Sequence, residues 1–131
     1  MRTYIATAFG NWKEARGAAD AMKWIGIECS SGWIDQAQAG AVGDAQASDD
    51  VLAKSHKDNY TDLGSSDALL VLRVPDCGET LFEAAHALWK MTIPIIWMGT
   101  PVLSAKMAPD RVRFAATRIE ALVMLASLVK P

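Results

Sequence analysis

Short apolar runs alternate with stretches of helical periodicity along the chain. Runs of β-branched and other apolar residues at 2–9, 68–74 and 93–98 predict buried strands, and shorter strands are predicted at 27–30 and 112–114. Between them, apolar residues recur at helical spacing, which predicts helices over about 11–25, 51–64, 79–91 and 117–129. Residues 35–50 are rich in Ala, Gln, Gly and Asp and are expected to form a loop with some helix.

The order of these elements predicts the fold class. The run at 68–74 is almost continuously apolar, as expected for a strand that is covered on both faces. Alternation of strands and helices predicts a three-layer α/β fold of the Rossmann-like kind, with a parallel sheet and helices on both faces. Residues 1–131 show no internal repeat and no linker, so a single domain is expected.

Local signals predict where the helices end and which faces they bury. Asn11 and Glu14 have the spacing of a capping box, and Gly26 stands where a C-cap is expected. The helix at 79–91 is expected to bury one apolar side, and so is the helix at 117–129. The predicted buried positions are Leu81, Ala84, Ala85, Leu88 and Trp89 in the first helix, and Ile119, Leu122, Val123 and Leu125 in the second.

Composition and charge exclude several classes of protein. Hydrophobic residues make up 51% and charged residues 21% of the chain, which is typical of a globular protein. The net charge of −2 argues against a protein that coats nucleic acid, because such a protein needs a basic surface. No apolar run approaches the length of a membrane span, and the first residues do not resemble a secretory signal. A cytoplasmic location is therefore expected, with Cys29 and Cys77 as reduced thiols.

Catalytic or binding residues are expected where the predicted strands end, because ligands of open α/β sheets bind at the carboxyl ends of the strands. Three carboxylates, Asp76, Glu79 and Glu83, lie within eight residues after the strand at 68–74. Acidic residues also cap helices and favour their first turn, so capping is the simpler interpretation for the first two. Glu83 lies beyond the first turn among apolar neighbours, so it belongs either to a solvent-facing stripe or to a site.

Other motifs predict little chemistry. Glu83-x-x-His86 resembles half of a di-iron carboxylate motif, but His56 has no glutamate three residues before it, so no metal and no cofactor are expected. Cys77 is interpreted as a structural thiol, and Lys54, His56 and Lys57 as a solvated helix face. Trp33, in a predicted loop, is the tryptophan most suited to stack on a ligand. The other tryptophans are expected in the core or in a subunit interface.

Several segments together resemble the nucleoside 2-deoxyribosyltransferase-like family. The run GETLFEAAHAL at 78–88 is similar to the Gly-rich loop and glutamate-bearing helix of that family. TYIATAF at 3–9, the segment 26–34, DLGSSDALL at 62–70 and IPIIWMG at 93–99 resemble its other landmarks in the same order. The resemblance implies a flavodoxin-like fold and cleavage of the N-glycosidic bond of deoxynucleosides or their monophosphates, by base transfer or hydrolysis. It also implies a homodimer or a higher homo-oligomer.

The resemblance further implies roles for individual residues. Glu83 would be the nucleophile that attacks the anomeric carbon, and Asp62 or Asp58 would bind the sugar or protonate the base. Asp76 is a second candidate for the acid that protonates the departing base. The remaining expected binding residues are Tyr4, Phe9 and Trp33 around the base, and Ala8, Phe9, Gly10, Gly78 and Glu79 near the sugar or a phosphate.

The sequence also departs from the family pattern. Glu79 stands where many relatives have glycine, which adds negative charge beside any phosphate. Asn59 occupies the place of the expected acidic residue, and Asp58 lies one position too early. These departures leave open a protein that binds a nucleotide without turnover, and the tryptophan count leaves open a structural or partner-binding protein. The preferred base, the choice between nucleoside and monophosphate, and the choice between transfer and hydrolysis stay open as well.

Overall fold

A five-stranded sheet forms the centre of the protein. The computed structural model describes residues 1–40, 48–74, 77–99, 101 and 108–129. The strands lie in the order β2-β1-β3-β4-β5, and every described pair is parallel. They span Arg2–Ala6 (β1), Glu28–Cys29 (β2), Ala68–Leu72 (β3), Ile95–Met98 (β4) and Val112–Ala115 (β5).

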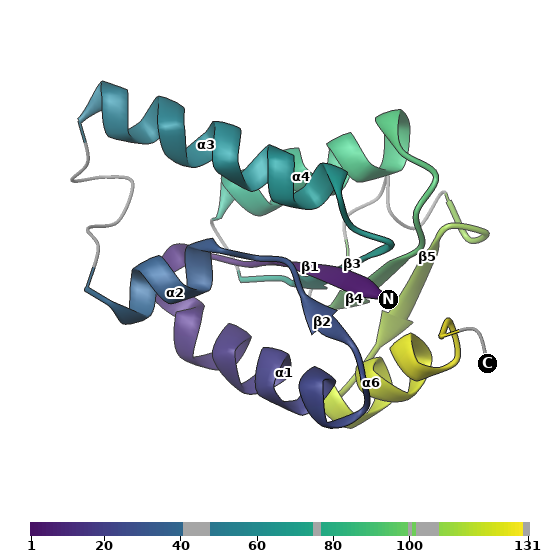
Figure 1. Cartoon of the computed structure of the whole chain (residues 1–131). Coiled ribbons are helices and arrows are strands. Elements are labelled where there is room, and N and C mark those ends of the chain that lie inside the picture. The colour runs from purple at the N-terminus through teal and green to yellow at the C-terminus, as the bar shows by residue number, and fades with distance from the viewer. Residues whose placement is uncertain (41–47, 75–76, 100, 102–107, 130–131) are drawn as a thin grey trace.

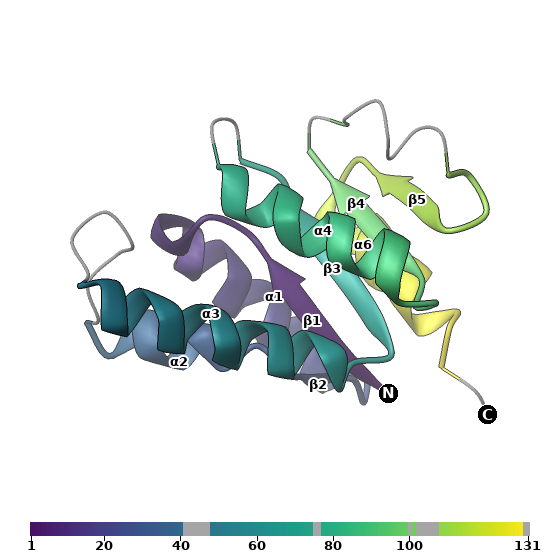
Figure 2. The same ribbon diagram turned by 90° about the horizontal axis from the view of Figure 1, so that it is seen from above.

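Helices cover both faces of this sheet (Figures 1 and 2). Helices α3 and α4 lie on one face, α1 and α6 lie on the other, and α2 lies beside α1 near the β2 edge. The described helices are η1 (Phe9–Asn11), α1 (Trp12–Trp24), α2 (Trp33–Gln38), α3 (Asp49–Gly64), α4 (Gly78–Lys90) and α6 (Arg118–Ala126). The predicted three-layer α/β fold with a parallel sheet is confirmed.

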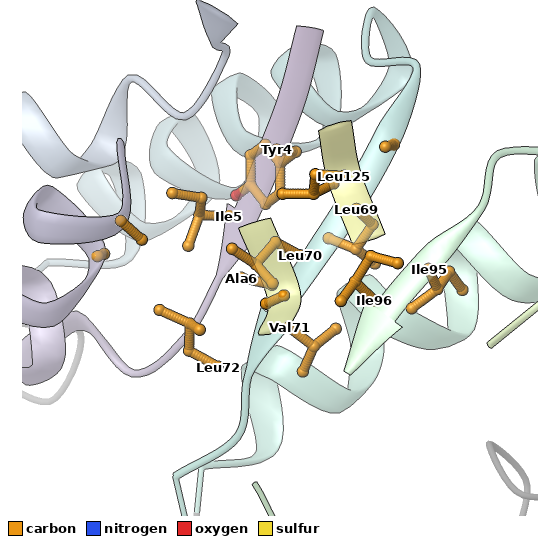
Figure 3. Close-up of a cluster of buried hydrophobic side chains, with 14 of the residues drawn as sticks. Tyr4, Ile5, Ala6, Leu69, Leu70, Val71, Leu72, Ile95, Ile96 and Leu125 are labelled. Carbon is orange, nitrogen blue, oxygen red and sulfur yellow. The ribbon is translucent and has the colours of Figure 1, made fainter. Parts of the chain in front are cut away.

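The three inner strands supply most of the core. All five residues of β3 are buried, as its continuous apolar run predicts. Figure 3 shows side chains of β1, β3 and β4 packed together, with Leu125 of α6 among them. Successive residues of a strand point to opposite faces, so Tyr4 and Ile5 of β1 contribute to different layers.

The structure confirms the predicted C-terminal end of α1 and contradicts the predicted N-terminal cap. Asn11 does not cap the helix: its backbone lies at φ −93° and ψ 21°, and its side-chain amide donates to Oγ1 of Thr7 at 3.0 Å. The 3-10 turn of η1 precedes α1 and removes the extended conformation that an N-cap needs. Gly26 ends the helix as predicted. It has φ +79°, and its N–H and that of Ile27 donate to the carbonyls of Lys23 and Met22, as in a Schellman motif.

The predicted buried faces of α4 and α6 are only partly correct. The buried residues of α4 are Thr80, Glu83, Ala84 and Ala87. Ala85 and Trp89 are exposed instead, and they line an apolar groove between α4 and strands β4 and β5. In α6, Leu125 is buried, whereas Ile119 is 76% and Val123 is 64% exposed. Both helices carry apolar residues on more than one side, so periodicity alone does not distinguish the covered side.

Several other expectations need correction or lie outside the described residues. The strand predicted at 2–9 ends at Ala6, because η1 follows almost at once. The region predicted as a loop from residue 35 contains most of α2, while residues 41–47 lie outside the described part. Trp24 and Trp89 are exposed, which excludes the core for these two residues and leaves a subunit interface as the remaining expectation. No helix among the described residues is long and apolar enough to cross a membrane.

Candidate functional site

A pocket of about 270 Å³ lies at the carboxyl ends of β1 and β3. From β1 the chain crosses to β2 on one side of the sheet, and β3 lies on the other side of β1, so this is the switch point where open α/β sheets bind ligands. The volume is close to the lower end of the range for small-molecule pockets, about 300–1,000 Å³. We call it the switch-point pocket. Its described lining residues are Thr7, Phe9, Trp33, Ser55, His56, Asn59, Cys77, Gly78, Glu79 and Glu83.

Glu83 supplies a buried carboxylate to this pocket. It lies in the second turn of α4, on the side of the helix that faces the sheet with Thr80, Ala84 and Ala87. Only 9% of Glu83 is exposed. A carboxylate in a small, partly enclosed pocket can act as a nucleophile or a general base. The position of Glu83 therefore matches a site rather than a solvent-facing stripe.

Tyr4 lies behind Glu83 in the core. Its side chain is fully buried in β1, and burial is the main reason that its pKa is raised well above the ordinary value of 10.0. The charge of Glu83, contact with that carboxylate, and the charge of Asp62 raise the pKa further. The phenol is therefore neutral near pH 7 and can donate its proton toward Glu83. Tyr4 is not among the residues that line the pocket, so its hydroxyl is placed to interact with the Glu83 carboxylate and not with a nucleobase in the pocket.

Helix α3 forms the opposite wall through polar residues. Ser55, His56 and Asn59 lie on one side of the helix and line the pocket. Asp58 turns away from the pocket and pairs with Lys54 at 2.7 Å. Because each residue of a helix is rotated by about 100° from the previous one, one position separates a pocket residue from a surface residue here. Asn59 therefore presents an amide to the pocket, whereas the neighbouring carboxylate of Asp58 lies on the surface.

Asp62 also lies off the pocket wall. Its Oδ2 accepts a hydrogen bond from the backbone N–H of Gly32 at 3.0 Å, which connects the end of α3 to the start of α2. Trp33 consequently begins a helix and is not in a loop. It is 5% exposed, and its indole N–H donates to the carbonyl of Ile5 at 3.0 Å. Only part of the Trp33 ring faces the pocket, next to Phe9, with 6.3 Å between the ring centroids.

The first turn of α4 closes the remaining side. The Sγ of Cys77 and the Oγ1 of Thr80 lie 3.4 Å apart, and the Cys77 side chain does not cap the helix. Gly78 begins the helix at the pocket, and a side chain there would meet open space. Oε2 of Glu79 lies 3.6 Å from Nδ1 of His56, which joins α4 to α3 across the pocket.

The predicted site residues are brought together only in part. Phe9, Trp33, Gly78, Glu79 and Glu83 line the pocket, and Tyr4 lies behind it. Ala8, Gly10, Asp58 and Asp62 are not among the lining residues, and Asp76 lies outside the described residues. The carbonyl of Ala8 instead accepts from the N–H of Asn11, and Gly10 is exposed.

Sequence reasoning missed Thr7, Ser55, His56, Asn59 and Cys77 as a set of lining residues. The spacing of Ser55, His56 and Asn59 on one helix was the available signal, but a polar helix face is equally typical of a surface. Among the described residues, no group of three or more His, Cys, Asp or Glu is placed to hold a metal ion.

Comparison with known proteins supports the fold. No protein-family model matches the sequence, and no curated protein matches it either. Among solved structures, the chain is similar to the CMP N-glycosidase BcmB of Clostridium botulinum, with a TM-score of 0.56 and 17% sequence identity. The similarity covers 95% of this chain and 98% of the other. At this identity the two proteins share an architecture over nearly their whole lengths.

Proposed function

We propose that the protein cleaves the N-glycosidic bond of 2′-deoxynucleosides or their 5′-monophosphates, with Glu83 as the nucleophile. The observation that carries this proposal is the buried carboxylate of Glu83 in the switch-point pocket, beside the neutral phenol of Tyr4. The shared architecture with a CMP N-glycosidase supports the class of bond. The resemblance of residues 78–88 to the glutamate-bearing helix of nucleoside 2-deoxyribosyltransferase-like proteins supports the choice of residue.

The chemistry proceeds in two displacements. One carboxylate oxygen of Glu83 attacks the anomeric carbon, and a C–O bond forms while the C–N bond breaks. The bonding electron pair leaves with the base, which takes up a proton at nitrogen. Water or a second base then attacks the same carbon and gives a proton to the conjugate base of the acid that protonated the first base, while the C–O bond to Glu83 breaks and Glu83 leaves as a carboxylate. A retaining route of this kind is common to glycosidases that use a carboxylate nucleophile.

The other groups of the pocket have supporting roles in this proposal. The Tyr4 hydroxyl orients Glu83, and the Asn59 amide offers both a donor and an acceptor to a sugar hydroxyl or a base edge. The rings of Phe9 and Trp33 provide an apolar surface for the base. Asp76 remains the candidate for the acid that protonates the departing base. An Asp76→Asn variant tests that role, because its defect should be smallest with bases that leave most easily.

Base release tests the proposal directly. The protein is incubated with a panel of deoxynucleosides and their monophosphates, with and without a second free base, and products are separated chromatographically. We expect release from some panel members and a loss of at least about 1,000-fold in Glu83→Gln, because the amide cannot form the glycosyl ester. Asp20→Asn, an exposed carboxylate on α1 across the sheet, is the matched control. Mass spectrometry should detect a deoxyribosyl adduct on Glu83 in the wild-type protein.

The outcomes separate the proposal from its alternatives. Exchange of one base for another indicates transfer, and release without exchange indicates hydrolysis. Release that persists in Glu83→Gln excludes Glu83 as the nucleophile. Binding of panel members without release indicates a nucleotide-binding protein, which the neutral Asn59 in the place of a carboxylate would favour. Ligand-induced melting shifts detect such binding.

A further inference from the structure

Two carboxylates lie one helical turn apart on the α4 side of the switch-point pocket. Glu79 and Glu83 are separated by four residues and both line the pocket. Residues at this spacing lie on the same side of a helix, about 6 Å apart along its axis. If Glu83 attacks the anomeric carbon, Glu79 lies at about the distance spanned by the sugar and its 5′ carbon. The group at the 5′ position of a substrate would then meet negative charge.

The described part of the pocket offers little positive charge to balance the negative charge of Glu79 and Glu83. The described lining residues include no lysine and no arginine. His56 is the described histidine there, and it already faces Glu79 at 3.6 Å. Arg73, at the end of β3, donates instead to the backbone carbonyls of Val74 and Cys77, which are in the connection to α4.

Helix α4 begins at the pocket, and free N–H groups at a helix N-terminus can bind phosphate. Here the first turn already carries the carboxylate of Glu79, which interacts favourably with the positive end of the helix dipole. A phosphate at the same place would have to approach Glu79 with about two negative charges of its own. The Glu79 side chain is about half exposed, so solvent weakens this repulsion without removing it, and the expected result is a preference for uncharged ligands rather than complete exclusion of phosphate.

We propose that the switch-point pocket selects uncharged nucleosides over nucleoside 5′-monophosphates and that Glu79 is the residue that determines this selectivity. The inference rests on the proposed function and narrows its substrate class. It sets this chain apart from its structural neighbour, which is a CMP N-glycosidase.

The test compares kcat/KM for a deoxynucleoside and its 5′-monophosphate with the same base. We expect the wild-type protein to favour the nucleoside at least 10-fold. Glu79→Gln keeps the shape and a polar contact for His56 but removes the charge, and it should lower this preference at least 5-fold, mainly through a lower KM for the monophosphate. Asp20→Asn changes the net charge equally, on the opposite face of the sheet, and should leave the preference unchanged. Raising the salt concentration should narrow the wild-type preference, because salt screens charge repulsion.

The outcomes distinguish failure of the selectivity from failure of the proposed function. A wild-type protein that uses the monophosphate as well as the nucleoside, or a preference unaffected by Glu79→Gln, overturns the inference and leaves the proposed function standing. Binding without base release overturns the proposed function. Melting shifts with the same ligand pairs then measure the selectivity, and equal shifts for nucleoside and monophosphate overturn it. Absence of both binding and release overturns both proposals.

Discussion

A buried carboxylate is expected to lower the stability of the fold that holds it. Glu83 is 9% exposed and lies among apolar residues of α4 and the sheet. Removing such a charge from water costs several kcal/mol, which favourable contacts recover only in part. We therefore predict that Glu83→Gln, the variant expected to abolish base release, makes the protein more stable. Exchange of stability for activity at such positions is common.

The magnitude follows from the neighbours of Glu83. Replacing the carboxylate by an amide removes a desolvation penalty of about 3 kcal/mol. It also weakens the favourable interactions of the carboxylate with its surroundings, the neighbouring Tyr4 hydroxyl among them, a loss of about 1–2 kcal/mol. Repulsion from Glu79 adds little to this balance, since that side chain is half exposed and screened by solvent. The net expectation is a stabilisation of about 1–2 kcal/mol, which raises Tm by about 3–8 °C for a chain of this size.

Thermal and urea unfolding, followed by circular dichroism, measure this effect. Asp20→Asn makes the same change at an exposed position and should leave Tm within about 2 °C of the wild-type value. Glu83→Ala should be less stable than Glu83→Gln, because it leaves a space and leaves the Tyr4 hydroxyl without its neighbour. A lower Tm for Glu83→Gln than for the wild type would refute the reasoning. It would mean that the fold stabilises the ionised form of Glu83.

Three further predictions concern the scaffold. The Arg111 guanidinium donates to four backbone carbonyls at and just beyond the end of α4, so Arg111→Met should lower the free energy of unfolding by about 2–4 kcal/mol, measured by urea titration. Gly99 has φ +96°, and an added Cβ would lie 2.7 Å from the carbonyl oxygen of Arg73, so Gly99→Ala should cost at least about 2 kcal/mol. Gly26→Ala, with φ +79° and open space, should cost only about 1 kcal/mol in the same assay, and equal losses would contradict the role of the close contact. The pKa of Tyr4 is higher in the folded than in the unfolded chain, so this group's contribution to stability is complete below about pH 10 and falls as the pH rises further. Tyr4→Phe should reduce the decline, and pH-dependent urea titrations that superimpose for the two proteins would contradict the assignment.

The fold was predictable because its signals are local and repeated. The apolar run at 68–74 identifies a strand covered on both sides, and the alternation of strands with helices leaves a parallel sheet as the natural arrangement. Gly26 was predictable for the same reason, since a helix that ends in the left-handed conformation favours glycine at one position. The faces of α4 and α6 were harder to predict, because both helices have apolar residues on more than one side.

The residues of the pocket were predictable only where a residue differed strongly in polarity from its neighbours in the sequence. Glu83 was recognisable because a carboxylate among apolar residues, just after the clearest strand, needs an explanation. The helical position of Trp33 was not predicted, because the residue before it, Gly32, is held by Asp62, thirty residues away, whose carboxylate accepts from the N–H of Gly32. A contact over that separation has no signature in the residues around Trp33.

The pocket wall formed by α3 shows how the sequence can indicate the right segment and still not identify the residue that faces the pocket. Asp58 and Asn59 are adjacent, and chemistry alone favours the carboxylate as the functional residue. The rotation of the helix decides otherwise: Asn59 faces the pocket, and Asp58 pairs with Lys54. Among the described residues, the carboxylates that line the pocket are Glu79 and Glu83, both from α4, whereas α3 contributes Ser55, His56 and Asn59 to the opposite wall. Under the two proposals above, an uncharged sugar end against Glu79 is the arrangement that this distribution of carboxylates favours.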